Sequence, residues 1–144
     1  MEYISHFKTV DKTMSKLIDL FGPIHYMAKY KEGKEYFFEN LITSIIGQQL
    51  SLKAAETIKN RVFNYLNYKV VPISFINAEI DELRKCGMSN SKINYVKSLS
   101  IALNNGDLIL EKIANLSDKE VIKELTKVKG IGEWTAEMFL FFSL

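Results

Sequence analysis

The sequence has 144 residues, of which 47% are hydrophobic, which is enough for one buried core and too few for two full domains. Its 19 basic and 17 acidic side chains nearly cancel, so a polyanionic partner would need a local site rather than a strongly basic surface. The single cysteine, Cys86, excludes an intramolecular disulfide and a cysteine-only metal site and is typical of a reducing cytosol, and two isolated histidines, His6 and His25, do not indicate a zinc centre.

The sequence predicts neither a secretion signal nor a membrane span. Residues 1–14 are charged where a signal peptide needs an apolar core. The longest apolar-dense run, residues 138–144, is much shorter than a membrane span. We therefore expect an intracellular, cytoplasmic protein with no membrane partner.

Apolar residues at intervals of three and four, together with only two prolines, predict an all-α fold. The first helix that we expect covers residues 14–21 and ends at Gly22-Pro23. The next covers residues 37–46 and has a broad apolar surface, so it should lie at the centre of the core. Ser51 is a suitable N-cap for a third helix. We interpret the only strand-like run, residues 68–75, as a connection because a proline interrupts it.

The second half of the chain continues the helical pattern. A short helix over residues 81–85 is followed by a turn and by a helix that carries an apolar stripe from 93 to 103. Ser117 and Glu120 have the spacing of a capping box, and the helix behind them runs toward residue 128. We divide the chain into an N-terminal helical segment, residues 1–36, and a compact multi-helix domain, residues 37–144.

A two-glycine turn lies between the last two predicted helices, in the sequence KVKGIGEWTAEM. Gly130 and Gly132 flank Ile131, and a helix begins directly afterwards, so several backbone N–H groups should point outward at a helix N-terminus. Such a turn binds anions, and Lys127 and Lys129 would add attraction for a phosphate. The alternative is that the two glycines only make a tight connection between helices.

The wider segment LTKVKGIGEWTAEM resembles the helix-hairpin-helix motif of the DNA glycosylase superfamily, in particular the branch that includes 3-methyladenine DNA glycosylase II. Residues 41–55 (LITSIIGQQLSLKAA) and 83–99 (LRKCGMSNSKINYVKSL) are similar to two further blocks of that branch, in the same order. The resemblance therefore covers residues 37–144. It implies a function in base excision DNA repair.

The resemblance assigns two roles to the hairpin backbone. It implies that Gly130, Ile131 and Gly132 donate backbone N–H groups to a phosphate beside the damaged base. It also implies that a monovalent cation, Na or K, is held by the main-chain carbonyls of Thr126, Val128 and Ile131. No other cofactor is expected.

Two neighbouring glutamines occupy the position at which the family has a loop that probes or fills the gap left by a flipped base. Gln48 and Gln49 could each hydrogen-bond to the unpaired base opposite the gap, and we favour this role more for Gln48. The alternative is a polar link between two helices.

Trp134 occupies the position at which bifunctional members of the family have a lysine. An indole cannot form the Schiff base that this lysine forms, but it can stack on a flipped, positively charged alkylated purine. The alternative is that Trp134 is part of the core. Met138, one turn further on, would share or back the base pocket. Other aromatic side chains could form pocket walls, although core packing explains them more simply: Tyr26, Tyr30, Tyr36 and Phe38.

No aspartate follows Trp134, whereas the family uses an aspartate after the second hairpin helix to stabilise the sugar cation. Glu133 and Glu137 belong to the helix itself. Residues 139–144 place apolar side chains around all sides of a helix, so this helix should be buried, and no cap or polar tail follows. We therefore expect a truncated glycosylase, inactive alone, with its catalytic aspartate beyond Leu144.

The complete protein implied by the resemblance is a monomeric, monofunctional DNA glycosylase. It would flip an alkylated purine out of double-stranded DNA and hydrolyse the N-glycosidic bond. Two alternatives stay open on the residues alone. One is a helix-hairpin-helix module that binds DNA without catalysis, and the other is a helical interaction protein whose apolar residues 138–144 recruit a partner or a second copy.

Overall fold

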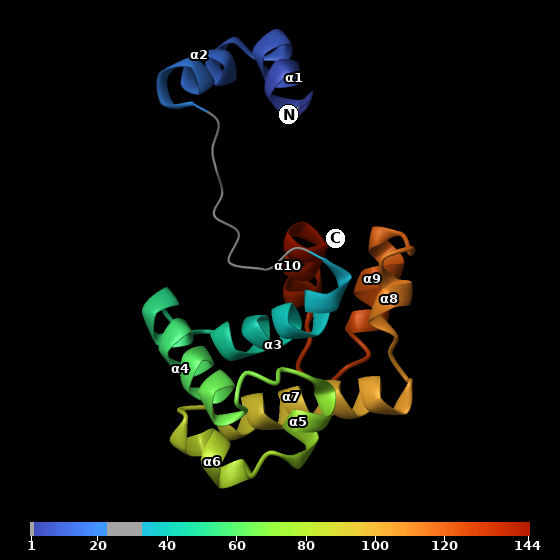
Figure 1. Ribbon diagram of the computed structural model, residues 1–144. Helices are drawn as coiled ribbons and strands as arrows, with labels where there is room; N and C mark the ends of the chain where they lie inside the picture. Colours follow the sequence, from blue (N-terminus) through green and yellow to red (C-terminus); the bar gives the residue numbers. More distant parts are fainter. Residues whose placement is uncertain (1, 23–32) are drawn as a thin grey trace.

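The computed structural model describes residues 2–22 and 33–144 of the chain. Within these residues the secondary structure is helical and contains no strand, which confirms the predicted all-α class (Figure 1). None of these helices is long and apolar enough to cross a membrane. Tyr26 and Tyr30, two of the candidate wall residues, lie outside the described residues, as does His25.

The two N-terminal helices, α1 (Glu2–Val10) and α2 (Lys12–Phe21), pack against each other. Asp11 caps α2, because its Oδ1 accepts hydrogen bonds from the backbone N–H groups of Thr13 and Met14 at 2.8 and 3.0 Å. The helix ends at Gly22, as predicted. No side chain of α2 is buried. The boundary between residues 36 and 37 as a division of domains stays a prediction.

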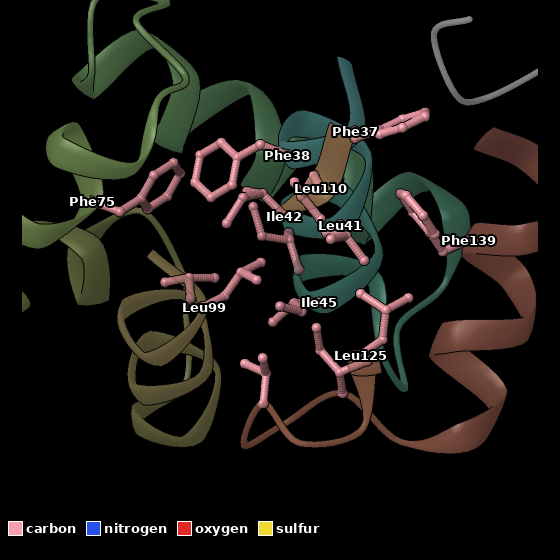
Figure 2. Packing of buried hydrophobic residues seen from close by; sticks show 14 of the residues in the cluster. Phe37, Phe38, Leu41, Ile42, Ile45, Phe75, Leu99, Leu110, Leu125 and Phe139 are labelled. Atoms are coloured by element: carbon pink, nitrogen blue, oxygen red, sulfur yellow. The ribbon is translucent and has the colours of Figure 1, made fainter. Parts of the chain in front are cut away.

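Helix α3 (Phe37–Gly47) lies at the centre of the core, as its apolar pattern predicts. The short 3₁₀ helix η1 (Lys34–Tyr36) leads into α3, and nine of the eleven residues of α3 are buried. It contacts α4 (Leu52–Tyr65), α7 (Asn90–Asn105) and α10 (Glu133–Ser143). Figure 2 shows Leu41, Ile42 and Ile45 of this helix inside the cluster. Truncating one such fully buried side chain to alanine costs about 2–5 kcal/mol, a large share of a typical domain's stability.

Aromatic pairs join α3 to elements on both sides. The ring of Phe37 meets that of Phe139 edge to face at a centroid distance of 5.2 Å. The ring of Phe38 meets that of Phe75 in the same way at 5.8 Å. Both pairs are visible in Figure 2. Phe38 is thus a core residue rather than a pocket wall, whereas Tyr36 is partly buried at the start of α3.

The interpretation of residues 68–75 as a connection is wrong for their second half. Pro72 begins helix α5 (Pro72–Asn77). A proline at the first position of a helix loses no hydrogen bond, because the N–H at that position has no partner within the helix. Helix α5 packs along α7. The Lys97 ammonium of α7 donates to three carbonyls at the C-terminal end of α5, those of Phe75, Ile76 and Ala78, at 3.1, 2.9 and 2.8 Å.

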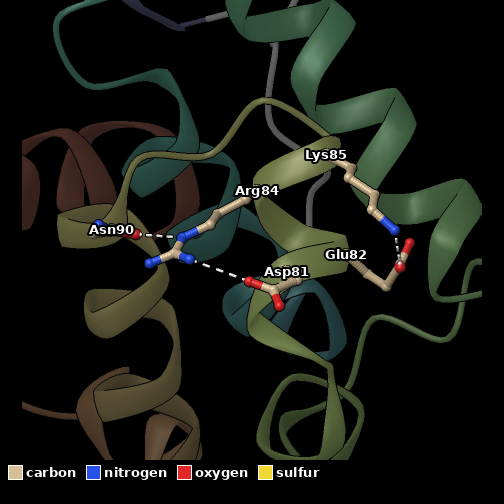
Figure 3. A network of polar contacts seen from close by, with 5 residues as sticks. All are labelled: Asp81, Glu82, Arg84, Lys85 and Asn90. Atoms are coloured by element: carbon tan, nitrogen blue, oxygen red, sulfur yellow. Dashed lines mark hydrogen bonds and ion pairs between the residues drawn. The ribbon is translucent and has the colours of Figure 1, made fainter.

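Helix α6 (Ile80–Lys85) is tied to the start of α7 by side chains (Figure 3). Arg84 donates from Nε to Asn90 Oδ1 at 2.7 Å and from a terminal nitrogen to Asp81 Oδ1 at 3.1 Å. These bonds fix the turn over residues 86–89, which leads into α7. The polar residues at the start of α7 therefore have a defined place next to the end of α3.

The chain then forms α8 (Leu110–Ile113), which is too short to be predicted from periodicity, α9 (Asp118–Leu125) and α10. The capping box of Ser117 and Glu120 before α9 is confirmed. In α10, Phe139 is buried at 2% exposure but Phe141 is 76% exposed, and Leu144, directly after the helix, is 49% exposed. The expectation that the apolar residues among 139–144 are buried on all sides is therefore wrong for Phe141 and Leu144.

Candidate functional site

The turn between α9 and α10 leaves backbone N–H groups free at the start of a helix. Its inner hydrogen bonds run from Val128 N to Leu125 O and from Ile131 N to Val128 O, both at 3.1 Å. In the described part of the chain, the N–H groups of Gly132, Glu133 and Trp134 donate to no protein acceptor. The N–H group of Gly130 also donates to no acceptor in these residues. These donors are suited to an anion.

The prediction that the Ile131 N–H group donates to a phosphate, together with the N–H groups of Gly130 and Gly132, is wrong. The Ile131 N–H group already donates to the Val128 carbonyl. The physical reason is that the turn tightens as it leaves α9, and this turns the Ile131 N–H group inward. Its side chain is buried as well. The donors that stay available belong to the two glycines and to the first turn of α10.

Helix α10 begins without a side-chain cap, like α3, α5, α6 and α8 of the described chain and unlike α2, α4 and α7. Side chains of Asp11, Ser51 and Ser89 accept hydrogen bonds from the first turns of α2, α4 and α7. Gly132, at the same position before α10, has no side chain and makes no such bond. The positive end of this helix dipole is thus open to solvent.

Gly130 is required by the fold. Its φ is +96°, in the region that side chains rarely allow. A Cβ atom added there would lie 2.0 Å from Cγ and 2.4 Å from Cβ of Tyr95 on α7. A change of rotamer cannot move the Tyr95 Cβ atom, so the backbone itself would have to shift.

Gly132 is not required by the fold. Its φ of −86° and ψ of 172° are open to any residue, and a Cβ atom there would meet no protein atom within 4 Å. A glycine in such a position leaves room for something outside the chain to approach the backbone. The two glycines of the turn therefore have different roles.

The turn between α3 and α4 contacts the hairpin through Gln48. The Gln48 side-chain Nε2 donates to the Gly130 carbonyl at 3.1 Å and to Thr135 Oγ1 at 3.3 Å. Gln48 is partly buried, whereas the side chain of Gln49 is exposed and its φ is +56°. The structure thus presents Gln49, rather than the favoured Gln48, to solvent.

Lys92 on α7 lies beside the same turn and contacts the end of α3. Its Nζ donates to the carbonyl of Ile46 at 2.8 Å, near the C-terminus of α3, where a cation is favoured by the helix dipole. Partial burial lowers the pKa of the Lys92 ammonium. Lys92 therefore holds the end of α3 against α7.

These groups surround one cavity of about 480 Å³, a size typical of small-molecule sites. Its lining includes Gln48, Gln49, Lys92, Tyr95, Gly132 and Trp134. Trp134 is 63% exposed, so it is not part of the core of the described residues. Met138, one turn further along α10, is partly buried and does not line this cavity.

The two lysines of the hairpin lie elsewhere. Lys127 forms an ion pair with Glu124 at 2.6 Å. Both Lys127 and Lys129 line a separate cavity of about 410 Å³ between α7 and the end of α9. Their charges can attract a polyanion at long range, but the structure does not bring them to the cavity beside Trp134.

The three carbonyls that the resemblance assigns to a monovalent cation, those of Thr126, Val128 and Ile131, all belong to the segment between α9 and α10. Val128 O accepts the Ile131 N–H, and those of Thr126 and Ile131 accept no hydrogen bond from the described residues. Carbonyls of this kind fit a monovalent cation. In the same part of the chain, no group of three His, Cys, Asp or Glu residues could hold a metal ion.

Sequence reasoning missed five residues that line the site: Ser89, Ser91, Lys92, Tyr95 and Thr135. Lys92 and Tyr95 lie one helical turn apart on α7, within a block that was identified by resemblance, but their partners are far away in the sequence. Thr135 is buried and accepts the Gln48 bond. No local pattern reports such long-range contacts.

The chain matches known proteins over most of its length. Residues 42–140 match the family described as "HhH-GPD superfamily base excision DNA repair protein". A DNA-3-methyladenine glycosylase 1 of Schizosaccharomyces pombe is 35% identical over 142 residues, which cover 96% of this chain and 61% of that protein. A DNA-3-methyladenine glycosylase of Saccharomyces cerevisiae is 39% identical over 119 residues, which cover 76% of this chain and 40% of that protein.

A solved structure of the S. pombe 3-methyladenine DNA glycosylase in complex with abasic DNA is similar throughout. Its TM-score is 0.84 at 33% identity, and the match covers 100% of this chain and 70% of that one. The chain thus spans 61% and 40% of the length of the two relatives compared by sequence. The family match, the hairpin and the all-α fold agree, and the chain belongs to the HhH-GPD superfamily of base excision DNA repair proteins.

Proposed function

We propose that this chain is the DNA-binding and base-receiving part of a monofunctional DNA glycosylase that removes alkylated purines from double-stranded DNA. The observation that carries the proposal is the position of Trp134. The only tryptophan of the chain is exposed in a cavity that also contains the free N–H groups at the start of α10. The names of the relatives, which are 3-methyladenine DNA glycosylases, support this substrate class.

The hairpin binds the sugar-phosphate chain in this proposal. The N–H groups of Gly130, Gly132 and Glu133 donate to a phosphate beside the damaged nucleotide, and the dipole of α10 favours its negative charge. These contacts read no base, so they hold DNA of any sequence. Carbonyls of Thr126, Val128 and Ile131 hold a monovalent cation, whose charge would attract the same phosphate.

Trp134 receives the flipped base. Its indole face can stack on a purine, and the positive charge of an alkylated purine adds a cation–π attraction of about 0.5–2 kcal/mol. Met138 backs Trp134 along the same face of α10, one turn on. An indole has no amine, so strand cleavage through a Schiff base at this position is excluded. Gln49 enters the gap that the flipped base leaves.

Hydrolysis needs a carboxylate near the sugar, and α10 offers only Glu133 and Glu137, which are both exposed on the helix surface. The sequence contains no aspartate after Asp118. We therefore expect these 144 residues to bind damaged DNA and to release no base by themselves. Binding to chromosomal DNA would place the protein inside the cell, and one chain suffices for the proposed site.

Affinity for two duplexes tests the proposal and separates it from a DNA-binding module without catalysis. The chain is titrated against a fluorescent duplex with a central abasic-site analogue and against the same duplex undamaged. A glycosylase scaffold binds the abasic duplex more tightly, whereas a passive module binds both equally. In both cases affinity falls steeply with salt. Equal affinities, or no binding at all, would overturn the glycosylase assignment.

A further inference from the structure

The side-chain amide of Gln48 joins two parts of the proposed DNA-binding surface. Its two acceptors, the Gly130 carbonyl and Thr135 Oγ1, lie 82 and 87 residues away in the sequence. A carbonyl can only accept a hydrogen bond, so the amide nitrogen and not the amide oxygen faces Gly130. The donor capacity of Gln48 is thus used within the protein.

The Gly130 peptide is held from two directions. Tyr95 of α7 lies where a Gly130 side chain would be, and Gln48 binds the carbonyl of the same residue. The next free N–H groups along the chain belong to Gly132 and to the first turn of α10. The orientation of these donors therefore depends on contacts from outside the hairpin.

The chain that enters the turn bearing Gln48 is anchored as well. Lys92 binds the carbonyl of Ile46 just before the turn. Gln49 follows directly after these two anchored residues; its φ is positive, and its exposed side chain lies beside Gly132 and Trp134 in the same cavity. A residue pair that looks equivalent in the sequence is divided into one inward and one outward side chain.

We propose that Gln48 is a positioning residue that couples the turn bearing Gln49 to the phosphate-binding turn, so that phosphate binding and base probing act as one unit. This inference rests on the proposed function. Gln48 itself then contacts no base, and its loss should disturb the hairpin N–H groups as well as Gln49. A glutamine that only probed the duplex would leave phosphate binding to undamaged DNA unchanged.

Matched variants test the coupling, Gln48→Met and Gln49→Met, which keep side-chain length and remove the amide. Gln48→Met should weaken binding to the undamaged duplex by about tenfold, as expected when one charge-assisted N–H contact to the phosphate is lost. It should also reduce the preference for the abasic duplex, because Gln49 is disturbed with it. Gln49→Met should reduce only the preference for the abasic duplex. If Gln48→Met instead behaves like Gln49→Met, or binds both duplexes like the unsubstituted chain, the inference is overturned.

A double-variant cycle adds a readout that a purely structural role would not move. Gln48→Met and Gly132→Ala both act on the same phosphate contact, so their combined loss of affinity should be less than the product of the two single losses. Independent, multiplicative losses contradict the coupling. If Gln48→Met fails to fold, Thr135→Val removes the second acceptor, and weaker binding to both duplexes is expected from it. No binding by the unsubstituted chain would overturn the proposed function itself, whereas normal binding with an inert Gln48 overturns this inference alone.

Discussion

Replacing Gly132 by alanine should weaken DNA binding and leave stability unchanged, whereas Gly130→Ala should destabilise the fold. The two glycines are separated by one residue and look interchangeable in the sequence. Gly130 has a φ of +96° and touches Tyr95, while Gly132 has an ordinary backbone conformation and faces open space. The pair is therefore its own control, with the same chemical change at two positions of one turn.

The magnitudes follow from these geometries. At Gly130, a positive φ costs about 1–3 kcal/mol for a residue with a side chain, and forced overlap with Tyr95 costs a further 1–3 kcal/mol or so. Against a typical domain stability of about 5–15 kcal/mol, the melting temperature should fall by roughly 10 °C. At Gly132, the entropic gain of Gly→Ala, about 0.4–1 kcal/mol, offsets the poorer N-cap, so stability changes by about 0.5 kcal/mol or less.

The DNA affinity of Gly132→Ala should fall by about 10- to 100-fold, because a methyl group displaces a phosphate from charge-assisted N–H contacts. Fluorescence anisotropy with the abasic-analogue duplex gives the affinity, and urea denaturation of the same samples gives the stability. Unchanged affinity in a folded Gly132→Ala variant would refute the reasoning about the open position. A Gly130→Ala variant as stable as the unsubstituted chain would refute the reasoning about the fold.

Three further substitutions have defined outcomes. Lys97→Met removes the donor to three carbonyls at the end of α5 and should lower the free energy of unfolding by about 2–3 kcal/mol in urea denaturation; no change would mean that water replaces the ammonium. Trp134→Ala should leave stability nearly unchanged because the side chain is exposed, and in the unsubstituted chain the fluorescence of this single tryptophan should be quenched more by a duplex containing methylated purines than by an undamaged one. Equal quenching would contradict stacking. Burial lowers the pKa of Lys92 in the folded state, so the unfolded state binds more protons between that pKa and the ordinary value, and stability should rise there with pH. Urea denaturation at alkaline pH should show a smaller rise for Lys92→Met than for the unsubstituted chain, and equal slopes would contradict the burial of the ammonium.

Much of the helix pattern could be predicted because the capping residues are local. Ser51 and Ser117 each precede a helix at the expected place, and Gly106 ends α7 in a left-handed conformation. Helix α5 was missed because Pro72 interrupts a strand-like run and also suits the first position of a helix, and only the packing against α7 decides between the two. Helix α8 is one turn long, which leaves no period to detect.

The site could be predicted only in part. The glycine turn and the exposed tryptophan have local signals, and resemblance to a known family identifies both. The difference between Gln48 and Gln49 depends on a hydrogen bond across 82 residues, and the need for Gly130 depends on Tyr95, 35 positions earlier. Because these contacts form only when the helices pack, no pattern within a single segment reports them.

Amide chemical shifts during a DNA titration test the central claim most directly, namely that the open start of α10 holds a phosphate. A ¹⁵N-labelled sample of this 16.6 kDa chain is titrated with the abasic-analogue duplex at moderate salt. We predict that the largest shift changes fall on the N–H groups of Gly130, Gly132, Glu133 and Trp134. Changes concentrated on other helices, with these four resonances unmoved at saturation, would contradict the account.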